Sequence, residues 1–594
     1  MRAWDLLRAP FGKERLMKRW GLMGLLALAA CGPDDSSDKG AQSQVCPNII
    51  AGSLSEPVET RSVHSPLVGD DGRQRVIIRY KDALAVRAAS RVEQVGGQVT
   101  ATFRSTPAVA ARLTPQEQRA LLAGDPTVES IELDQEWRAL APATAPASSF
   151  LSSALQGVTA RELSAGLRKV QANEVWDLDG DGLPDPGRPT GAGVRLCVVD
   201  SGLDLEHPEL RDAVVAGRDL LEGDDTPSDF SSGHGWGTGH GTHVAGIIAA
   251  RPGQGGLGAP YVESAGVMGV APGVELIIAR VLDLHGRTHM SFVLAAVEYC
   301  AEQGAKVISL SLGGGAPTRT AFEVFEAAHA QGILVVAAAG NSGSQVVDYP
   351  ASDPHVLAVG AVDAQDRRAS FSSGGSQLGL MAPGVDVLST FPRGQGAFST
   401  VDVRGTQPLS RSLLYAPIQN KWGKLVDCGG GESLDSCQGS TCSGFVAYVR
   451  QGEVPTDVAM VNVMKQGARA VIFGNSRPEG GVDILAMPRR GQWVPAVTIT
   501  QAGGTVLHRM QGELARLSMS AADYAYMSGT SMAAPYVSGV AALLFSARPS
   551  ATPDQVKHAV LSSAKDLGPS GFDEGHGHGL VQARHALEVL TQVP

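Results

Sequence analysis

Near its C-terminal end the chain reads Gly529-Thr530-Ser531-Met532-Ala533-Ala534-Pro535, shortly before the apolar run of residues 537–545. Small residues followed by an apolar run are typical of a tight turn that opens a helix. Ser531 is therefore expected at a helix N-terminus, where backbone N–H groups and the helix dipole favour developing negative charge. A serine hydroxyl is a weak nucleophile at neutral pH, so a catalytic role also requires a base and a group that orients the base.

Candidates for both groups occur upstream. Residues 194–199 form an apolar run, typical of a buried strand, within Val198-Val199-Asp200-Ser201-Gly202. A second segment, Gly239-His240-Gly241-Thr242-His243-Val244-Ala245-Gly246, opens a helix of small residues. Taken alone, Asp200 could be a helix cap, and the two histidines could suggest a metal pair, although the H-E-x-x-H pattern is absent.

With an aspartate, a histidine and a serine in that chain order, these segments resemble the subtilisin-like serine proteases, or subtilases. The resemblance covers about residues 170–390 and 524–590. It implies that Asp200 orients the base, that His240 is the base and that Ser531 is the nucleophile. His243 is left as a structural residue, because the family uses the first histidine of this motif.

A fourth matching segment is Ala338-Ala339-Gly340-Asn341, which follows the apolar residues 333–337. In the family this asparagine donates its side-chain N–H to the oxyanion, and losing such a donor costs about two to three orders of magnitude in rate. The resemblance therefore assigns Asn341 to the oxyanion hole. Without it, Asn341 would be interpreted as an ordinary turn residue.

Strand-like and helix-like segments alternate along the chain, for example at residues 276–282, 290–303 and 307–312. This alternation predicts an α/β fold with a doubly wound, mainly parallel sheet. Ligands of such sheets bind beyond the carboxyl ends of the strands. Asp200 and Asn341 both follow predicted strands, as that rule requires.

The resemblance also implies a substrate-binding edge. Ser311, Leu312 and Gly313 would pair with an extended substrate backbone, and Gly340 would line the same site. Asp348, in Asp348-Tyr349-Pro350-Ala351, belongs to a segment similar to the lining of the family's primary specificity pocket. If its carboxylate points into that pocket, it would favour Lys or Arg before the scissile bond. The alternative is a solvated loop aspartate.

Composition limits the class of protein. The chain has 594 residues, of which 43% are hydrophobic and 18% are charged, so several globular domains can form. Its net charge of −11 argues against nucleic acid as the main partner, because phosphate binding needs a basic face. The predicted chemistry needs no cofactor.

The N-terminal residues 1–31 combine basic residues with a short apolar run that ends Leu28-Ala29-Ala30-Cys31-Gly32. The run is too short to span a bilayer and fits a secretory signal. Its end resembles the bacterial lipoprotein signal, which implies that Cys31 is lipidated and anchors an exported protein to a membrane. Plain secretion is the alternative. Residues 32–72 are interpreted as a linker.

Residues 73–138 show the order β-α-β-β-α-β. This order resembles the inhibitor-type propeptide of subtilases, a ferredoxin-like α+β domain that assists folding and occupies the active site until it is removed. An unrelated α+β adaptor is the alternative. Residues 139–165, rich in Ala, Ser and Pro, would be the processed linker, with the cleaved bond left open.

An acidic stretch follows in Asp177-Leu178-Asp179-Gly180-Asp181-Gly182 and Asp185. Alternating carboxylates with a glycine for the tight turn are typical of calcium loops. The closing glutamate of an EF-hand is absent, so a solvated acidic turn is an equal alternative. Calcium bound by Asp177, Asp179, Asp181 and Asp185 would be structural.

The catalytic domain is predicted in two parts, residues 166–390 and 523–594, because about 135 residues separate the strand ending at Thr390 from the serine motif. The intervening residues 391–522 contain strand and helix signals of their own. Residues 444–450 and 467–475 resemble the protease-associated domain, a mixed α/β module that some subtilases carry at this point. The family expectation is a lid or substrate-selecting module, and a passive insertion is the alternative.

Seven cysteines occur in the chain. Export permits disulfides, so two of the three cysteines clustered at Cys428, Cys437 and Cys442 are expected to pair, with the pairing left open. Cys197 and Cys300, on a predicted strand and an apolar helix face, are expected to be buried thiols.

These features predict an exported serine endopeptidase, made as a propeptide-inhibited zymogen and acting as a monomer on proteins or peptides. One alternative is a catalytically silent surface protein that binds peptides, but all four matched positions are intact. Another is a zinc hydrolase built on His234, His240 and His243. The physiological substrate cannot be derived from these residues.

Overall fold

The computed structural model describes residues 71–81, 85–140, 163–229, 238–258, 266–438, 444–452, 454–476, 482, 485–487 and 492–592. The predicted signal with Cys31, most of both linkers, His234 and Cys442 lie outside these ranges. Within them the chain forms several sheets. The parts around the three largest are called here, after the predictions, the N-terminal domain, the catalytic domain in two parts and the inserted domain.

The catalytic domain is built on a seven-stranded sheet in the order β14-β13-β12-β10-β6-β8-β7, in which each neighbouring pair is parallel. Its central strands are almost wholly buried, because helices cover both faces. The doubly wound parallel sheet was predicted correctly. Its strands are β6 (Arg195–Asp200), β7 (Val214–Asp219), β8 (Glu275–Arg280), β10 (Val307–Leu310), β12 (Leu334–Ala338), β13 (Val356–Val362) and β14 (Leu378–Pro383).

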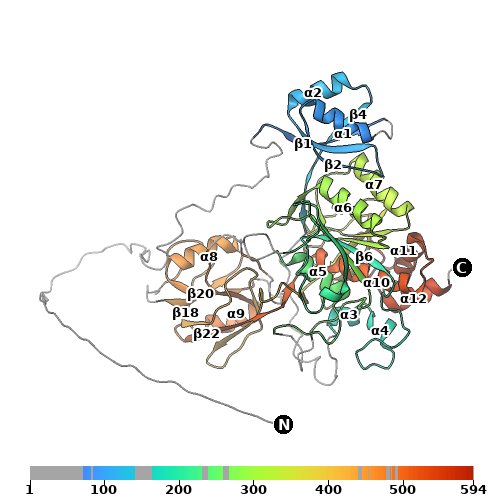
Figure 1. The fold of residues 1–594 in the computed structure, drawn as a ribbon. Coiled ribbons are helices and arrows are strands. Elements are labelled where there is room, and N and C mark those ends of the chain that lie inside the picture. The colour runs from blue at the N-terminus through green and yellow to red at the C-terminus, as the bar shows by residue number, and fades with distance from the viewer. Residues whose placement is uncertain are drawn as a thin grey trace, which may run out of the picture. The chain divides into compact units, whose positions relative to one another are not determined.

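Helices cover both faces of this sheet (Figure 1), and a hydrophobic core lies on each face. On one face pack α5 (His240–Ala249) and α10 (Thr530–Ala547), with α3 (Ala165–Lys169), α4 (Asn173–Trp176), α11 (Pro553–Ser562) and α12 (Ala583–Gln592). On the other pack α6 (Met290–Glu302) and α7 (Arg319–Ala330). A short helix, η1 (Arg211–Ala213), and the antiparallel pair β15 (Val387–Thr390) and β23 (Tyr524–Met527) complete the domain.

Helix α10 begins one residue before Ser531 and runs through the centre of one core. Among the described residues it is the one helix that is long and apolar enough to cross a bilayer, and 89% of that window is buried inside the protein. Its apolar character therefore serves packing, and burial of this helix fixes the position of the serine at its first turn.

The N-terminal domain has the predicted β-α-β-β-α-β order and an antiparallel sheet in the order β2-β3-β1-β4. A capping box between Thr114 and Glu117 starts its second helix. The elements are β1 (Gln74–Tyr80), α1 (Ala85–Gln94), β2 (Gln98–Thr102), β3 (Ala108–Leu113), α2 (Pro115–Gly124) and β4 (Val128–Leu133).

A further strand, β5 (Glu136–Ala139), follows this domain and was not predicted. It lies between β9 (Arg287–His289) and β11 (Leu312–Gly313) and pairs antiparallel with both. Four residues are too short for a periodic pattern, and both partner strands belong to the catalytic domain. The sequence therefore carried no local signal for β5.

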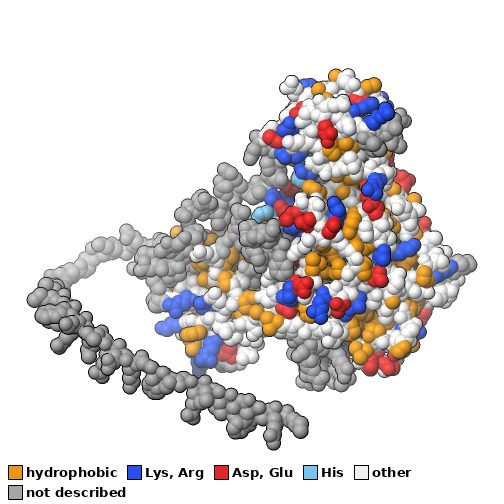
Figure 2. Space-filling view, in the orientation of Figure 1, with side chains coloured by type: hydrophobic (Ala, Val, Ile, Leu, Met, Phe, Trp, Pro, Cys, Tyr) orange, Lys and Arg blue, Asp and Glu red, His pale blue; other side chains and the backbone are white. Residues whose placement is uncertain are grey.

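The inserted domain has a mixed seven-stranded sheet in the order β16-β22-β18-β19-β20-β21-β17, with a hydrophobic core on each face. Its elements are β16 (Gly396–Val403), β17 (Ser410–Ser412), β18 (Lys421–Asp427), β19 (Phe445–Arg450), α8 (Thr456–Lys465), β20 (Ala468–Gly474), β21 (Ala496–Ile499), α9 (Gln501–His508) and β22 (Leu514–Ala522). Figure 2 shows basic and acidic side chains intermixed on the visible face of the described residues, as on an ordinary solvated surface.

The cysteine predictions had mixed outcomes. Cys428 and Cys437 form a disulfide, which confirms that two cysteines of the inserted cluster pair. The prediction of free thiols at Cys197 and Cys300 was wrong, because these residues form a disulfide between β6 and α6 with their Cα atoms 5.8 Å apart. Both cysteines are buried as expected, but only the packing of α6 on the sheet brings together residues 103 positions apart.

Candidate active site

Asp200 and His240 form a buried pair. Asp200 is the last residue of β6, and His240 is the first residue of α5. The Nδ1 atom of His240 lies 2.7 Å from Oδ1 of Asp200, and that oxygen also accepts a 2.7 Å hydrogen bond from the backbone N–H of Ser201. A carboxylate facing Nδ1 holds the proton there, so Nε2 is left as the proton acceptor.

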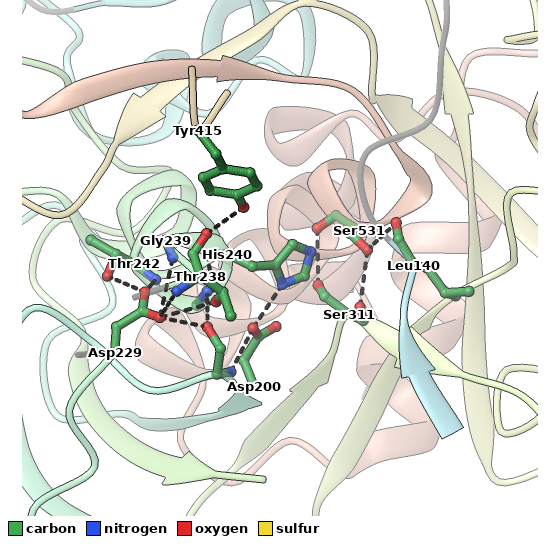
Figure 3. Close-up of polar contacts among 12 residues, drawn as sticks. Leu140, Asp200, Asp229, Thr238, Gly239, His240, Thr242, Ser311, Tyr415 and Ser531 are labelled. Atoms are coloured by element: carbon green, nitrogen blue, oxygen red, sulfur yellow. Dashed lines mark hydrogen bonds and ion pairs between the residues drawn. The ribbon is translucent and has the colours of Figure 1, made fainter. Parts of the chain in front are cut away.

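The ring of His240 lies between Asp200 and Ser531, with Nε2 on the serine side (Figure 3). This buried nitrogen has no hydrogen-bond partner within the part of the chain that the structure describes. The Oγ atom of Ser531 lies 2.6 Å from the carbonyl oxygen of Leu140 and 2.9 Å from that of Ser311, and its single proton can be donated to either.

The carbonyl group of Leu140, just beyond β5, lies against the serine. Its oxygen accepts hydrogen bonds from Oγ of Ser531 and from Nδ2 of Asn341. The Oδ1 atom of Asn341 accepts from both the backbone N–H and the hydroxyl of Thr530, each at 2.9 Å. Because the backbone N–H of Thr530 can only donate, it identifies the amide oxygen of Asn341, and the amide is oriented with its N–H toward Leu140.

Gly529 allows the Leu140 carbonyl to come this close, because a Cβ at that position would lie 2.9 Å from the carbonyl oxygen. Thr530, which orients Asn341, received no role in the sequence interpretation. Its position next to Ser531 in the same motif was the available signal. The sequence did not show that Asn341 would contact Thr530.

The segment from Trp137 to Leu140 lies along the predicted substrate-binding edge. Leu312 pairs with Ala139 and Gly313 pairs with Arg138, while the backbone N–H of Leu140 donates to the carbonyl of Ser311 at 3.2 Å. The edge assigned to Ser311, Leu312 and Gly313 therefore binds an extended backbone, and that backbone is part of the same chain. Trp137 is fully buried and contacts Tyr349 edge to face at 5.7 Å.

The carboxylate of Asp348 lies beside Gly340. A Cβ added to Gly340 would be only 2.4 Å from Oδ2 of Asp348. Burial raises the pKa of Asp348. The place of Asp348 in the specificity pocket stays a prediction.

Asp229 was missed by the sequence interpretation. Its buried carboxylate accepts hydrogen bonds from the hydroxyls of Ser201, Thr238 and Thr242 and from the backbone N–H of Gly239. It thus joins the residue after Asp200 to the loop and helix that carry His240 (Figure 3). Burial raises the pKa of Asp229, while hydrogen bonds from these hydroxyls oppose the shift.

His243 has the role of a structural residue. Its Nε2 lies 3.1 Å from the carbonyl oxygens of Val387 and Ala525, which fixes this nitrogen as the donor. Burial, and next the neighbouring His240, lower the pKa of His243 to about 3, so the ring is neutral at physiological pH. His234, the third histidine of the zinc alternative, lies outside the described residues.

Three of the four predicted calcium ligands come together. Carboxylate oxygens of Asp177, Asp179 and Asp181 lie within 4.8 Å of one another. Asp185 lies outside that group and accepts a hydrogen bond from the backbone N–H of Leu178 at 2.6 Å. Clustered carboxylates of this kind suit calcium, which prefers oxygen ligands.

Comparison with known proteins agrees with this geometry. A model described as the Subtilase family matches residues 191–415 and 487–579. Thermitase from Thermoactinomyces vulgaris is 35% identical over 276 residues, which are 44% of this chain and 90% of thermitase. Subtilisin E from Bacillus subtilis (strain 168) is 32% identical over 335 residues, 55% of this chain and 76% of that protein.

Among solved structures, the psychrophilic subtilisin-like protease Apa1 from the Antarctic psychrotroph Pseudoalteromonas sp. AS-11 is similar, with a TM-score of 0.51 and 29% identity. The match covers 71% of this chain and 96% of Apa1. The chain therefore belongs to the subtilase family and is a subtilisin-like serine endopeptidase.

Proposed function

We propose that this endopeptidase acts through a triad of Asp200, His240 and Ser531 and is made as a zymogen that cleaves its own N-terminal domain. The observation that carries the proposal is the carbonyl group of Leu140, which lies against Oγ of Ser531 and Nδ2 of Asn341. A scissile carbonyl must occupy this place for attack, with its oxygen facing donors that strengthen as charge develops.

In the proposed mechanism, Oγ of Ser531 attacks the carbonyl carbon as its proton passes to Nε2 of His240. Asp200 holds the imidazole through Nδ1 and stabilises the imidazolium. Nδ2 of Asn341 and the backbone N–H of Ser531 stabilise the oxyanion. His240 then protonates the leaving amine, and water hydrolyses the acyl-enzyme in a second round with the same base.

In this proposal the N-terminal domain is the inhibitory propeptide, and the bond cleaved is the one between Leu140 and Ala141. Hydrogen bonds on both sides of β5 hold the residues before this bond in the extended form that a protease cleaves. The product carboxylate at Leu140 would remain in the site, so the cleaved domain would still block it.

Contacts away from the cleft support retention of this domain. Arg79 is buried and donates two hydrogen bonds, at 2.8 and 2.9 Å, to the carboxylate of Glu323 on α7. Asp134 accepts from the backbone N–H and hydroxyl of Ser291 in the first turn of α6, both at 2.8 Å. A carboxylate at a helix N-terminus is favoured by the helix dipole.

Substrate preference follows from the same segment. A reporter with Trp-Arg-Ala-Leu before the scissile bond copies residues 137–140 and is expected to be cleaved well. A second reporter with Arg in place of this Leu tests Asp348. If Asp348 confers a basic preference, the wild type should cleave the Arg peptide faster than the Leu peptide, and Asp348→Asn should lose this difference. Equal rates with both peptides would refute a basic preference.

We further propose that the loop of Asp177, Asp179 and Asp181 binds a structural calcium ion. The ion would hold together three carboxylates that otherwise repel one another. Calcium should then raise the melting temperature of the wild type but not of Asp179→Asn. A calcium response that is the same in both proteins would refute this site.

Export and lipidation at Cys31 belong to the proposal as well, and so does a monomeric mature enzyme. Because processing would separate Cys31 from the mature enzyme, the test uses the uncleaved Ser531→Ala chain, in which adding Cys31→Ser should move the protein from the membrane fraction to the soluble exported fraction. Equal partitioning of the two proteins would leave plain secretion as the better hypothesis.

The decisive experiment compares intact masses of the wild type and Ser531→Ala after expression and purification. The wild type should yield a fragment that begins at Ala141, and the variant should stay uncleaved at this bond. Cleavage of both proteins at the same bond would mean that another protease processes the chain. If both remain intact and neither cleaves casein after trypsin treatment, the chain is better described as a peptide-binding protein.

A further inference from the structure

One hydrogen bond links the inserted domain to the loop that carries His240. Tyr415, three residues after β17, donates its hydroxyl proton to the carbonyl oxygen of Thr238 at a distance of 2.7 Å. Thr238 is two residues before His240, and Figure 3 shows the tyrosine on the side of the histidine away from Ser531.

This hydrogen bond acts on a peptide group that is already held from its other side. The carbonyl of Thr238 and the N–H of Gly239 belong to the same planar peptide unit. Tyr415 holds the carbonyl, and Oδ1 of the buried Asp229 accepts from the N–H at 3.1 Å. With both ends of the plane bonded, the peptide cannot rotate without losing a partner.

The next residue along the chain is the catalytic histidine. Gly239 has φ of 71°, so the chain turns sharply into α5 at this point. The backbone N–H of His240 donates to the hydroxyl of Thr238 at 3.2 Å. The orientation of the Thr238–Gly239 peptide therefore sets the point from which the His240 side chain leaves the backbone.

The segment that carries Tyr415 is itself anchored. Arg411 on β17 is buried and forms a paired contact with Asp386 of the catalytic domain, at 2.9 and 2.8 Å. Its guanidinium also lies 3.8 Å from the ring centre of Tyr526. Tyr415 has φ of 65°, an uncommon conformation for a bulky residue, which persists where the surroundings fix it.

We propose that Tyr415 is a positioning residue for catalysis, through which the inserted domain holds His240 in its reactive orientation. The inference rests on the proposed role of His240 as the base. It gives the inserted domain a function other than that of a lid or a passive insertion: folding of this domain completes the histidine side of the active site.

The test is Tyr415→Phe, which removes one oxygen atom and keeps the ring. Tyr448→Phe, the same change on β19 of the same domain, is the matched control. Activity on a short peptide should be normalised to sites titrated with a serine-directed phosphonate, so that unfolded protein does not count. Loss of one hydrogen bond predicts a kcat lowered about 2- to 13-fold in Tyr415→Phe, with KM unchanged and Tyr448→Phe like the wild type.

The rate of phosphonylation should fall by the same factor, because this reaction also uses His240 as the base. Equal kcat and phosphonylation rates in Tyr415→Phe and Tyr448→Phe would overturn the proposal, as would a loss confined to KM. Failure of the triad itself would look different, since Ser531→Ala would then retain the activity of the wild type.

Discussion

The N-terminal domain contacts the serine end of the active site, whereas the inserted domain contacts the histidine end. The first places Leu140 against Ser531 and Asn341 through a paired strand. The second places the hydroxyl of Tyr415 on the backbone beside His240. In the proposed zymogen, the N-terminal domain fills the place of the substrate and has to leave before the enzyme can act on other proteins. A domain that supports the base from outside can stay for the life of the enzyme.

The largest expected effect lies at the serine end. Asn341→Ala removes the side-chain donor to the carbonyl of Leu140 and should lower kcat by about two to three orders of magnitude. The same variant should process its own Leu140–Ala141 bond more slowly by a similar factor. Steady-state assays and time courses of processing measure the two effects.

This result would show that the two ends of the active site contribute unequally to catalysis, since Tyr415→Phe at the histidine end should lower kcat far less. Asn341→Ala also leaves the donors of Thr530 without their acceptor, so unfolding must be followed alongside activity. A loss below tenfold in a stably folded Asn341→Ala protein would contradict the assignment of the oxyanion hole.

Two buried arginines allow the two domains to be compared by one kind of substitution. Arg411→Met leaves Asp386 buried without its cation, so the free energy of unfolding of the mature enzyme should fall by about 3–5 kcal/mol. Arg79→Met should leave the mature enzyme unaffected, because in the proposed maturation Arg79, which pairs with Glu323, is removed with the N-terminal domain.

Arg79→Met should instead weaken retention of the cleaved domain and hasten the onset of activity after processing. Urea unfolding of the phosphonylated mature enzyme and the lag before casein cleavage give the two readouts. Two outcomes would contradict the distinction between a removable and a permanent domain. One is a mature enzyme that Arg79→Met destabilises, and the other is a mature enzyme that Arg411→Met leaves unaffected.

The smallest expected effect is a pH dependence of the N-terminal interface. Burial opposes ionisation of Glu323, but hydrogen bonds from Thr106 and Arg79 prevail and lower its pKa below the ordinary value of 4.5. Because the pKa is lower in the bound state, binding is strongest above pH 4.5 and weakens as pH falls through and below that value. Acid should therefore release the cleaved domain.

Co-elution of the cleaved domain with the enzyme in size-exclusion chromatography, between pH 3.5 and about 7, measures this release. Glu323→Gln should show weaker co-elution that depends less on pH. Glu326→Gln, an exposed position on the same helix, is the matched control and should behave like the wild type. Identical pH curves for the two variants would contradict the role of Glu323.

Much of the site could be predicted because its chemistry is carried by short local motifs. Asp200 ends an apolar strand, and His240 and Ser531 begin helices of small residues, so the contacts of each with its neighbours in the chain specify its backbone position. The parallel sheet was predictable for the same reason, because buried strands consist of continuous apolar runs.

The remaining features depend on pairs of residues that are distant in the sequence. Three such features are the disulfide of Cys197 and Cys300, the hydrogen bonds to Asp229 and the pairing of strand β5. In each case, the sequence pattern of one segment gives no information about its partner. In the sequence, Cys197 cannot be distinguished from other buried strand residues. Only the packing of α6 against β6 brings Cys300 close to it.

By itself, the sequence determined the fold class, and it predicted the three candidate triad residues, Asn341 and the positions of two additional domains along the chain. Only the tertiary structure decided that Leu140 meets Ser531 and that Tyr415 meets the backbone before His240. The physical reason is that a short motif specifies the local backbone conformation around a residue. The approach of two distant segments results from the packing of the whole sheet and its helices.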